Sequence, residues 1–138
     1  MNARTRRCYK AWVNVLGLIT ARGGSKGIPG KNVALCGGKS LLAWTAEASL
    51  GAACVTRTVI STDDAQIAEC AKCLGVDVPF LRPTELASDT ATSIDVAIHA
   101  VSWLCEHERW SPDVLVLLQP TSPLRVSRHI DEAFALLA

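Results

Sequence analysis

The sequence has almost no net charge and lacks an apolar run long enough to cross a membrane. Its 138 residues include 14 Lys and Arg against 13 Asp and Glu, which gives a net charge of +1. This balance argues against long-range attraction to nucleic acid or to an anionic membrane. The first apolar run ends at Ile19 and falls well short of the roughly 20 residues that a membrane helix needs. We therefore expect a cytoplasmic protein with neither nucleic acid nor membrane as a partner.

The cysteines and histidines lack the spacing of a metal site or a disulfide framework. Cys70 and Cys73 have the C-x-x-C spacing of redox and zinc sites, but no second pair of cysteines or histidines follows at a suitable distance. The six cysteines lie mostly beside apolar, helix-like patterns, which predicts buried free thiols. The three histidines have no paired partner either. No metal ligand is predicted from these residues.

Two common nucleotide-binding motifs are also absent from the Gly-rich stretch Ile19–Val33, ITARGGSKGIPGKNV. The Walker A pattern fails because Gly30-Lys31 is followed by Asn32, and Ser25 stands where the first glycine is required. The dinucleotide pattern GxGxxG fails because the four glycines do not have its spacing. The stretch is therefore neither of the two commonest phosphate loops.

What remains is a long, basic loop directly after an apolar strand. Its glycines permit main-chain N–H groups to approach an anion closely. Arg22, Lys26 and Lys31 supply positive charge, and Ser25 adds a hydrogen-bond donor. Such a loop suits a triphosphate that is held while its α-phosphorus is attacked. The alternative is a basic loop that is simply solvated.

Alternating strand and helix patterns predict a single α/β domain at residues 13–138, after a basic N-terminal tail at residues 1–12. Continuous apolar runs favour strands buried on both faces, and helices between them imply right-handed crossovers and a parallel sheet of order 3-2-1-4. This order places the Gly-rich loop and the loop Gln119–Arg125 at one crevice. The chain ends on an apolar helix after four strands, so an incomplete domain is expected. The predicted strands are Val13–Thr20, Thr58–Ser61, Val76–Leu81 and Asp113–Leu118, and the helices are Ser40–Leu50, Asp64–Leu74, Ser93–Cys105 and Ser127–Leu137. The predicted apolar stripe of Ser93–Cys105 is Ile94, Ile98, Val101 and Cys105, and Thr62 or Asp63 is a candidate cap for Asp64–Leu74.

Four stretches in order resemble the acylneuraminate cytidylyltransferases, the enzymes that activate sialic and related nonulosonic acids. They are ARGGSKGIPGKN, VISTDDAQIAECAKCLGVDV, RPTELASDTATSID and LLQPTSPLR, and the resemblance covers about Val13 to Ala138. It implies the Rossmann-like nucleotide-diphospho-sugar transferase fold. It also implies transfer of CMP from CTP to an acidic nine-carbon sugar, with release of pyrophosphate, a requirement for Mg²⁺ and a homodimer in the full-length form. The family is substantially longer, so the Mg²⁺ ligands are expected outside this chain.

The resemblance also implies roles for individual residues. The nucleotide cradle would be formed by Arg22, Ser25, Lys26, Lys31 and Asn32, with Asn32 near the base and ribose. Arg82 and Ser93 would contact the cytidine, and Gln119, with Thr121 and Ser122 nearby, would face the sugar. Arg22, Lys31 and Gln119 are the candidate catalytic residues.

Each of these roles has a purely structural alternative. Arg82 before Pro83 also suits a strand end, and Ser93 also suits a helix N-cap. Asp63 and Asp64 look like metal ligands but are interpreted as strand-end and helix-cap residues. A different sugar or nucleotide substrate, and a non-catalytic nucleotide-binding module with an exposed apolar sheet edge, stay open as alternative functions.

Overall fold

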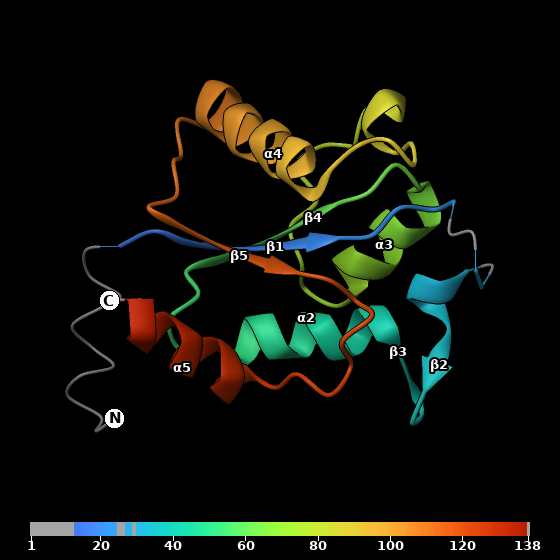
Figure 1. Cartoon of the computed structure of the whole chain (residues 1–138), viewed down its shortest axis with the longest axis horizontal. Helices are drawn as coiled ribbons and strands as arrows, with labels where there is room; N and C mark the ends of the chain where they lie inside the picture. The colour runs from blue at the N-terminus through green and yellow to red at the C-terminus, as the bar shows by residue number, and fades with distance from the viewer. Residues whose placement is uncertain (1–12, 25–26, 29, 138) are drawn as a thin grey trace.

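The computed structural model describes residues 13–24, 27–28 and 30–137. The predicted tail at residues 1–12, together with Ser25 and Lys26, lies outside the described residues. Within them, helices separate the successive strands β1, β4 and β5 along the chain (Figure 1). The elements are β1 (Val15–Thr20), the 3-10 helix η1 (Lys31–Val33), β2 (Leu35–Cys36), β3 (Lys39–Ser40), α2 (Leu41–Gly51), β4 (Arg57–Ser61), α3 (Ala65–Cys73), the 3-10 helix η2 (Thr84–Leu86), α4 (Ser93–Glu108), β5 (Val114–Leu118) and α5 (Ser127–Leu137).

Three parallel strands form the central sheet, in the order β4-β1-β5. In the middle strand, Leu18 pairs with Val59 on one side and Leu117 on the other. The apolar sequence of β1 follows from this position, because a central strand is covered on both faces. The predicted parallel α/β fold is confirmed, and so is the order of these three strands.

The prediction of a strand at Val76–Leu81 is wrong, although this segment lies beside β4, where the order 3-2-1-4 requires it. Only an isolated parallel bridge joins Asp77 to Val59 in β4. The Asp77 N–H donates to the Thr58 carbonyl at 3.0 Å, and the Asp77 carbonyl accepts from Ile60 N–H at 3.1 Å. Pro79 follows two residues later and has no N–H to continue the ladder.

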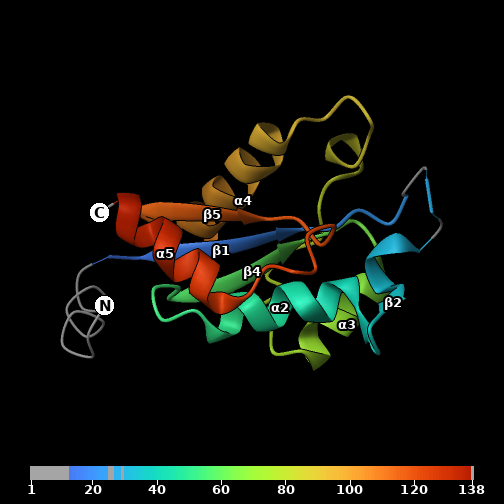
Figure 2. The ribbon, with the colours of Figure 1, turned by 60° about the horizontal axis from the view of Figure 1, so that its bottom comes forward.

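Helices cover both faces of the sheet. Figures 1 and 2 show α4 on one face and α2, α3 and α5 on the other. The core is divided accordingly into two clusters. Leu16 and Leu18 of β1 pack with Ala100 and Leu104 of α4. Residues such as Ile19 pack in the opposite cluster with buried residues of α2, α3 and α5.

The face of α4 that is buried differs from the predicted one. The predicted apolar stripe included Ile94 and Ile98, which are 70% and 58% exposed. Val96, Ala100 and Leu104 are buried instead, at the same helical spacing. The sequence contains two apolar stripes on this helix, so periodicity alone could not choose between them.

A short hairpin of β2 and β3 follows η1 and was not predicted. Gly37 and Gly38 form its turn with φ of 61° and 85°, the left-handed region that two-residue hairpins favour. Trp44 Nε1 donates to the Cys36 carbonyl at 2.5 Å, which ties the hairpin to α2. The GGKS segment, Gly37–Ser40, therefore builds a turn and the Ser40 cap of α2.

The thiol prediction is only partly correct. None of the described cysteines forms a disulfide with another, but Cys54 alone among them is buried. Cys70 and Cys73 lie on the exposed side of α3, because Ile67 and Ala71 supply the side that faces the core. Within the described residues, no helix is both long enough and apolar enough to span a membrane.

Candidate functional site

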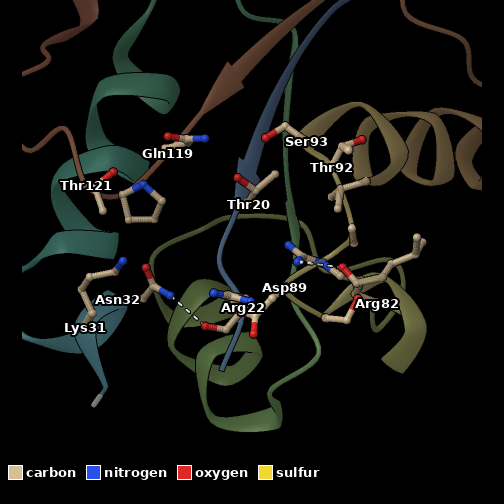
Figure 3. Close-up of a pocket in the computed structure, with 15 residues that line it drawn as sticks. Thr20, Arg22, Lys31, Asn32, Arg82, Asp89, Thr92, Ser93, Gln119 and Thr121 are labelled. Atoms are coloured by element: carbon tan, nitrogen blue, oxygen red, sulfur yellow. Dashed lines mark hydrogen bonds and ion pairs between the residues drawn. The ribbon is translucent and has the colours of Figure 1, made fainter. Parts of the chain in front are cut away.

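A cavity of about 310 Å³ lies where the carboxyl ends of the central strands meet the loops that follow them (Figure 3). Thr20 is the last residue of β1, and Gln119 directly follows β5. Ligands bind at this edge in open parallel sheets. The lining residues are Thr20, Arg22, Lys31, Asn32, Arg82, Leu86, Ser88, Asp89, Ala91, Thr92, Ser93, Val96, Gln119, Pro120 and Thr121.

The described site residues predicted from the sequence come together here. All six of them line the cavity, and Thr121 joins them, while Ser122 does not. Figure 3 shows Lys31 and Asn32 on one side, Arg82 on the other, and Arg22 between them. The residues in question are Arg22, Lys31, Asn32, Arg82, Ser93 and Gln119.

Arg22 is held by contacts to both its side chain and its main chain. Its Nη1 lies 2.6 Å from Asp89 Oδ1, in an ion pair whose side chains are 32% and 47% exposed. Its carbonyl accepts a 2.9 Å hydrogen bond from Asn32 Nδ2. The next N–H, that of Gly23, donates to Asp63 Oδ1 at 2.9 Å. The arginine thus enters the cavity from a fixed main chain.

Asn32 is buried, and its amide group serves the loop. Its Nδ2 donates to the Arg22 carbonyl, which joins two parts of the Gly-rich stretch that are ten residues apart. The expected contact of Asn32 with base and ribose stays a prediction. The structure shows that the same side chain also holds the main chain of the loop at Arg22.

Lys31 begins η1 directly after Gly30, whose φ of 65° places it in the left-handed region. This conformation favours glycine and turns the chain so that Lys31 lines the cavity. Its ammonium group has no carboxylate partner among the described residues. The lysine is therefore available to an anion, in contrast to the paired Arg22.

Arg82 is buried and also lines the cavity. Its Nη2 and Nε donate to the carbonyl and hydroxyl of Ser61 at 2.7 and 3.0 Å. Burial lowers the pKa of Arg82, Asp63 opposes that change, and Arg22 adds to it. Arg82 thus clamps the end of β4, but it does not itself end a strand, and its contact with cytidine stays a prediction.

The first turn of α4 forms another part of the wall. Thr92 is the N-cap: its hydroxyl accepts from Asp95 N–H, and the Asp95 carboxylate accepts from Thr92 N–H. The alternative of Ser93 as the N-cap is therefore wrong, since Ser93 is already the first helical residue. The N-terminal end of this 16-residue helix adds positive potential at the cavity.

Asp63 and Asp64 are engaged with main-chain groups. Asp64 caps α3, where its Oδ1 accepts from Gln66 and Ile67 N–H at 2.7 and 3.1 Å. Asp63 accepts from Gly23 instead of capping a helix. Their interpretation as strand-end and helix-cap residues is confirmed, and the suggestion that Thr62 or Asp63 caps α3 is wrong.

Several lining residues were not assigned from the sequence. Thr20, Ser88, Asp89 and Thr92 all contribute polar atoms to the wall. Three of them lie within RPTELASDTATSID, one of the stretches that carried the family resemblance. The stretch was therefore recognised, but these three residues were given no role. Thr20 was included only as a strand end.

The cavity is cationic and does not fit a metal ion by itself. Arg22, Lys31 and Arg82 face a single carboxylate among the described lining residues, Asp89, which is paired with Arg22. Within the described part of the chain, no group of three His, Cys, Asp or Glu side chains is placed to hold a metal ion. A Mg²⁺ ion needs oxygen ligands, which these residues do not supply as a set. The arrangement instead suits a ligand with several negative oxygens.

Comparison with known proteins agrees with this geometry. Residues 16–138 match the family described as cytidylyltransferase. The chain is 42% identical over 121 residues to the CMP-N,N'-diacetyllegionaminic acid synthase of Legionella pneumophila, and the match covers 88% of this chain and 52% of that protein. It is 41% identical over 122 residues to the N-acylneuraminate cytidylyltransferase of Escherichia coli, covering 88% of this chain and 28% of that protein.

Solved structures agree at the level of the fold. A CMP:2-keto-3-deoxy-manno-octonic acid synthetase complexed with CTP superposes with a TM-score of 0.73 at 20% identity, covering 88% of this chain and 46% of that chain. A cytidylyltransferase from Leptospira borgpetersenii gives a TM-score of 0.66 at 24% identity, covering 90% of this chain and 48% of that one. The chain thus spans about half the length, or less, of these relatives. By its sequence match over residues 16–138, it belongs to the cytidylyltransferase family.

Proposed function

We propose that this chain carries the nucleotide-binding part of a cytidylyltransferase that transfers CMP from CTP to a sialic or related nonulosonic acid. The observation that carries the proposal is the convergence of Arg22 and Lys31 on one cavity at the carboxyl edge of the sheet. The first turn of α4 faces the same space. A nucleoside triphosphate matches this arrangement of charge and helix end.

The proposed reaction displaces pyrophosphate at the α-phosphorus of CTP. The anomeric oxygen of the sugar forms the new bond to phosphorus, and the bond to the oxygen that bridges the α- and β-phosphates breaks. The hydroxyl proton passes to solvent. Negative charge builds up on the phosphate oxygens in this step, so the cations Arg22 and Lys31 would lower its barrier. Gln119, which directly follows β5 and lines the cavity, is proposed to face the sugar.

The acid substrate is proposed from the names of the relatives. Those most similar in sequence include enzymes named for diacetyllegionaminic, acylneuraminic and pseudaminic acids. All three are acidic nine-carbon sugars, so the same class is proposed here. The cytidine contacts of Arg82 and Ser93 and the roles of Ser25 and Lys26 belong to the proposal as well. The proposal also includes a requirement for Mg²⁺, a cytoplasmic location and a homodimer of a longer form.

Pyrophosphate release tests the proposal. The chain is incubated with CTP, Mg²⁺ and, in separate reactions, the neuraminic, legionaminic and pseudaminic acids. We expect release that depends on both CTP and one of the acids. The proposal fails if none of the acids supports release and CTP does not bind.

A binding module without turnover is the second candidate, and the sheet edge favours it. Among the described residues β5 has a strand neighbour on one side only, and its Leu117 is 36% exposed. Exposed apolar surface at this edge is what the module alternative predicts. CTP binding without pyrophosphate release, under the same conditions, would select this candidate.

A further inference from the structure

We propose that Asp63 is a positioning residue for the nucleotide site, which acts by fixing the peptide group between Arg22 and Gly23. The inference rests on the proposed function, since it concerns how Arg22 is presented to the triphosphate. Asp63 follows the end of β4 and does not line the cavity. An effect of Asp63 on binding therefore passes either through the loop or through its charge.

One peptide group of the loop is bound at both of its polar ends. Its carbonyl oxygen, on Arg22, accepts from Asn32 Nδ2 at 2.9 Å. Its N–H, on Gly23, donates to Asp63 Oδ1 at 2.9 Å. Two hydrogen bonds on opposite edges of one planar group fix its orientation. The direction in which the Arg22 side chain leaves the main chain is fixed with it.

Gly23 is in close contact with the same turn. A Cβ added to Gly23 would lie 2.7 Å from Asp64 Oδ2 and 2.8 Å from Asp64 Cβ, so the loop rests directly against this residue. Asp64 is itself held as the N-cap of α3. The support for the loop is thus the start of a helix, which is what a positioning role needs.

The charge of Asp63 would act in the opposite direction. A carboxylate close to a cationic cavity disfavours an anionic ligand, and Asp63 is close enough to offset part of the lowering of the Arg82 pKa that burial causes. If Asp63 acted through charge alone, its removal would strengthen the binding of a triphosphate. If it acts through the hydrogen bond to Gly23, its removal weakens that binding. The two explanations predict opposite signs.

The test uses the whole chain and two variants of Asp63. Asp63→Ala removes the acceptor, whereas Asp63→Asn removes the charge but keeps a carbonyl oxygen that can accept from Gly23. CTP and inorganic tripolyphosphate are the probes, titrated by calorimetry. Hydrogen exchange at the Gly23 amide is followed by NMR in the free protein. We expect Asp63→Ala to raise both dissociation constants about three- to tenfold and to speed exchange at Gly23, and Asp63→Asn to stay within about twofold of wild type in binding.

A matched control separates positioning from general stability. Asp131 is another carboxylate that accepts main-chain hydrogen bonds, from Ala53 and Cys54 at 3.1 and 2.8 Å. These residues precede β4, at the end of that strand away from the cavity. Asp131→Ala should lower the melting temperature without changing the dissociation constants or the Gly23 exchange rate.

The outcomes distinguish the inference from the proposed function. Tighter binding in both Asp63 variants, or unchanged Gly23 exchange in Asp63→Ala, would overturn the positioning role. A wild-type chain that binds neither probe would overturn the proposed function and the effect of Asp63 on binding. The exchange measurement needs no ligand, so it would still decide whether the tether exists.

Discussion

Lys31 and Arg22 present different situations to an incoming anion. Lys31 has no carboxylate partner among the described residues, whereas Arg22 is paired with Asp89. An unpaired ammonium group in a cavity gains a charge-assisted contact on binding without first losing one. At the scale of single residues, the removal of Lys31 should therefore have the simplest effect on the affinity for an anion.

Lys31→Ala should weaken CTP binding by about 1.5–3 kcal/mol, the range for one hydrogen bond to a charged group. Titration calorimetry measures the change. Lys72→Ala is the control, because it removes the same charge away from the cavity. Lys72 pairs with Glu69 on the exposed side of α3. Equal CTP affinities in all three proteins would contradict the assignment of Lys31.

Asp89→Asn should have the reverse effect and tighten CTP binding about two- to fivefold. The substitution removes a competitor for the Arg22 guanidinium, and an exposed pair of this kind contributes about 0–1 kcal/mol. Glu69→Gln makes the same change in charge away from the cavity and should leave the affinity unchanged. Weaker binding in Asp89→Asn would instead show that Asp89 orients Arg22 for the ligand.

The sequence predicted the cavity's cations better than its other polar groups. Arg22 and Lys31 stand out because a Gly-rich loop after a strand has few other uses for clustered positive charge. Asp89 and Thr20 do not stand out, since a lone carboxylate or hydroxyl is common in any loop. The task of Asn32 depends on a contact with Arg22, which no local pattern encodes.

At the scale of elements, β1 and α2 approach each other closely at Gly17. A Cβ there would collide with the Ser49 hydroxyl and would lie 3.3 Å from a Val55 methyl group. Ser49 is fully buried and shares a 2.7 Å hydrogen bond with Thr58, so it cannot move away freely. This contact explains a glycine in the middle of a central strand.

Gly17→Ala should destabilise the fold by about 1–3 kcal/mol, the usual cost of overpacking a core. Thermal unfolding should show a melting temperature lower by several degrees. Gly24→Ala is the control, because an added Cβ at Gly24 meets no atom within 4 Å. Similar melting temperatures for the two variants would contradict the packing argument.

His99, on α4, makes the stability of the fold depend on pH. Burial lowers the pKa of His99, Arg82 lowers it further, and Glu85 opposes them. Its Nδ1 is buried without a hydrogen-bond partner in the described structure. The pKa of His99 is lower in the folded state than in the unfolded state, so the neutral imidazole favours folding. This contribution to the free energy of unfolding is complete above the unfolded pKa of about 6.5 and is lost as the pH falls through the folded value.

Replacing His99 with Phe should reduce the loss of stability in acid. The variant keeps a ring beside Phe80, whose centroid lies 4.9 Å from that of His99, and removes the titration. Between about pH 7.5 and pH 5, the melting temperature of wild type should fall more than that of His99→Phe, by on the order of 1–2 °C because the group is partly exposed. Parallel curves would contradict the role of His99.

The errors in the predicted elements have physical causes. Val76–Leu81 has a strand-like composition, but Pro79 interrupts its hydrogen bonding and leaves one bridge. The buried face of α4 was misassigned because Ile94 and Val96 both begin apolar stripes. Only the position of the helix over β1 decides between them, and that is a tertiary property.

At the scale of the whole molecule, the sheet order brings together segments that are distant in the sequence. Thr20, Arg82 and Gln119 meet at one edge because the crossovers place β1 between β4 and β5. This part of the fold was predictable, since parallel strands with intervening helices allow few orders. The chain spans about half the length of these relatives or less, so nucleotide binding is measured separately from pyrophosphate release.

The most direct test of the central claim is a titration of the 138-residue chain with CTP, and with ATP, GTP and UTP under the same conditions. A cavity built for CTP predicts saturable binding of one CTP per chain, with weaker binding of the other three nucleotides. The account would be contradicted by absence of CTP binding at millimolar concentration, or by equal affinity for all four nucleotides.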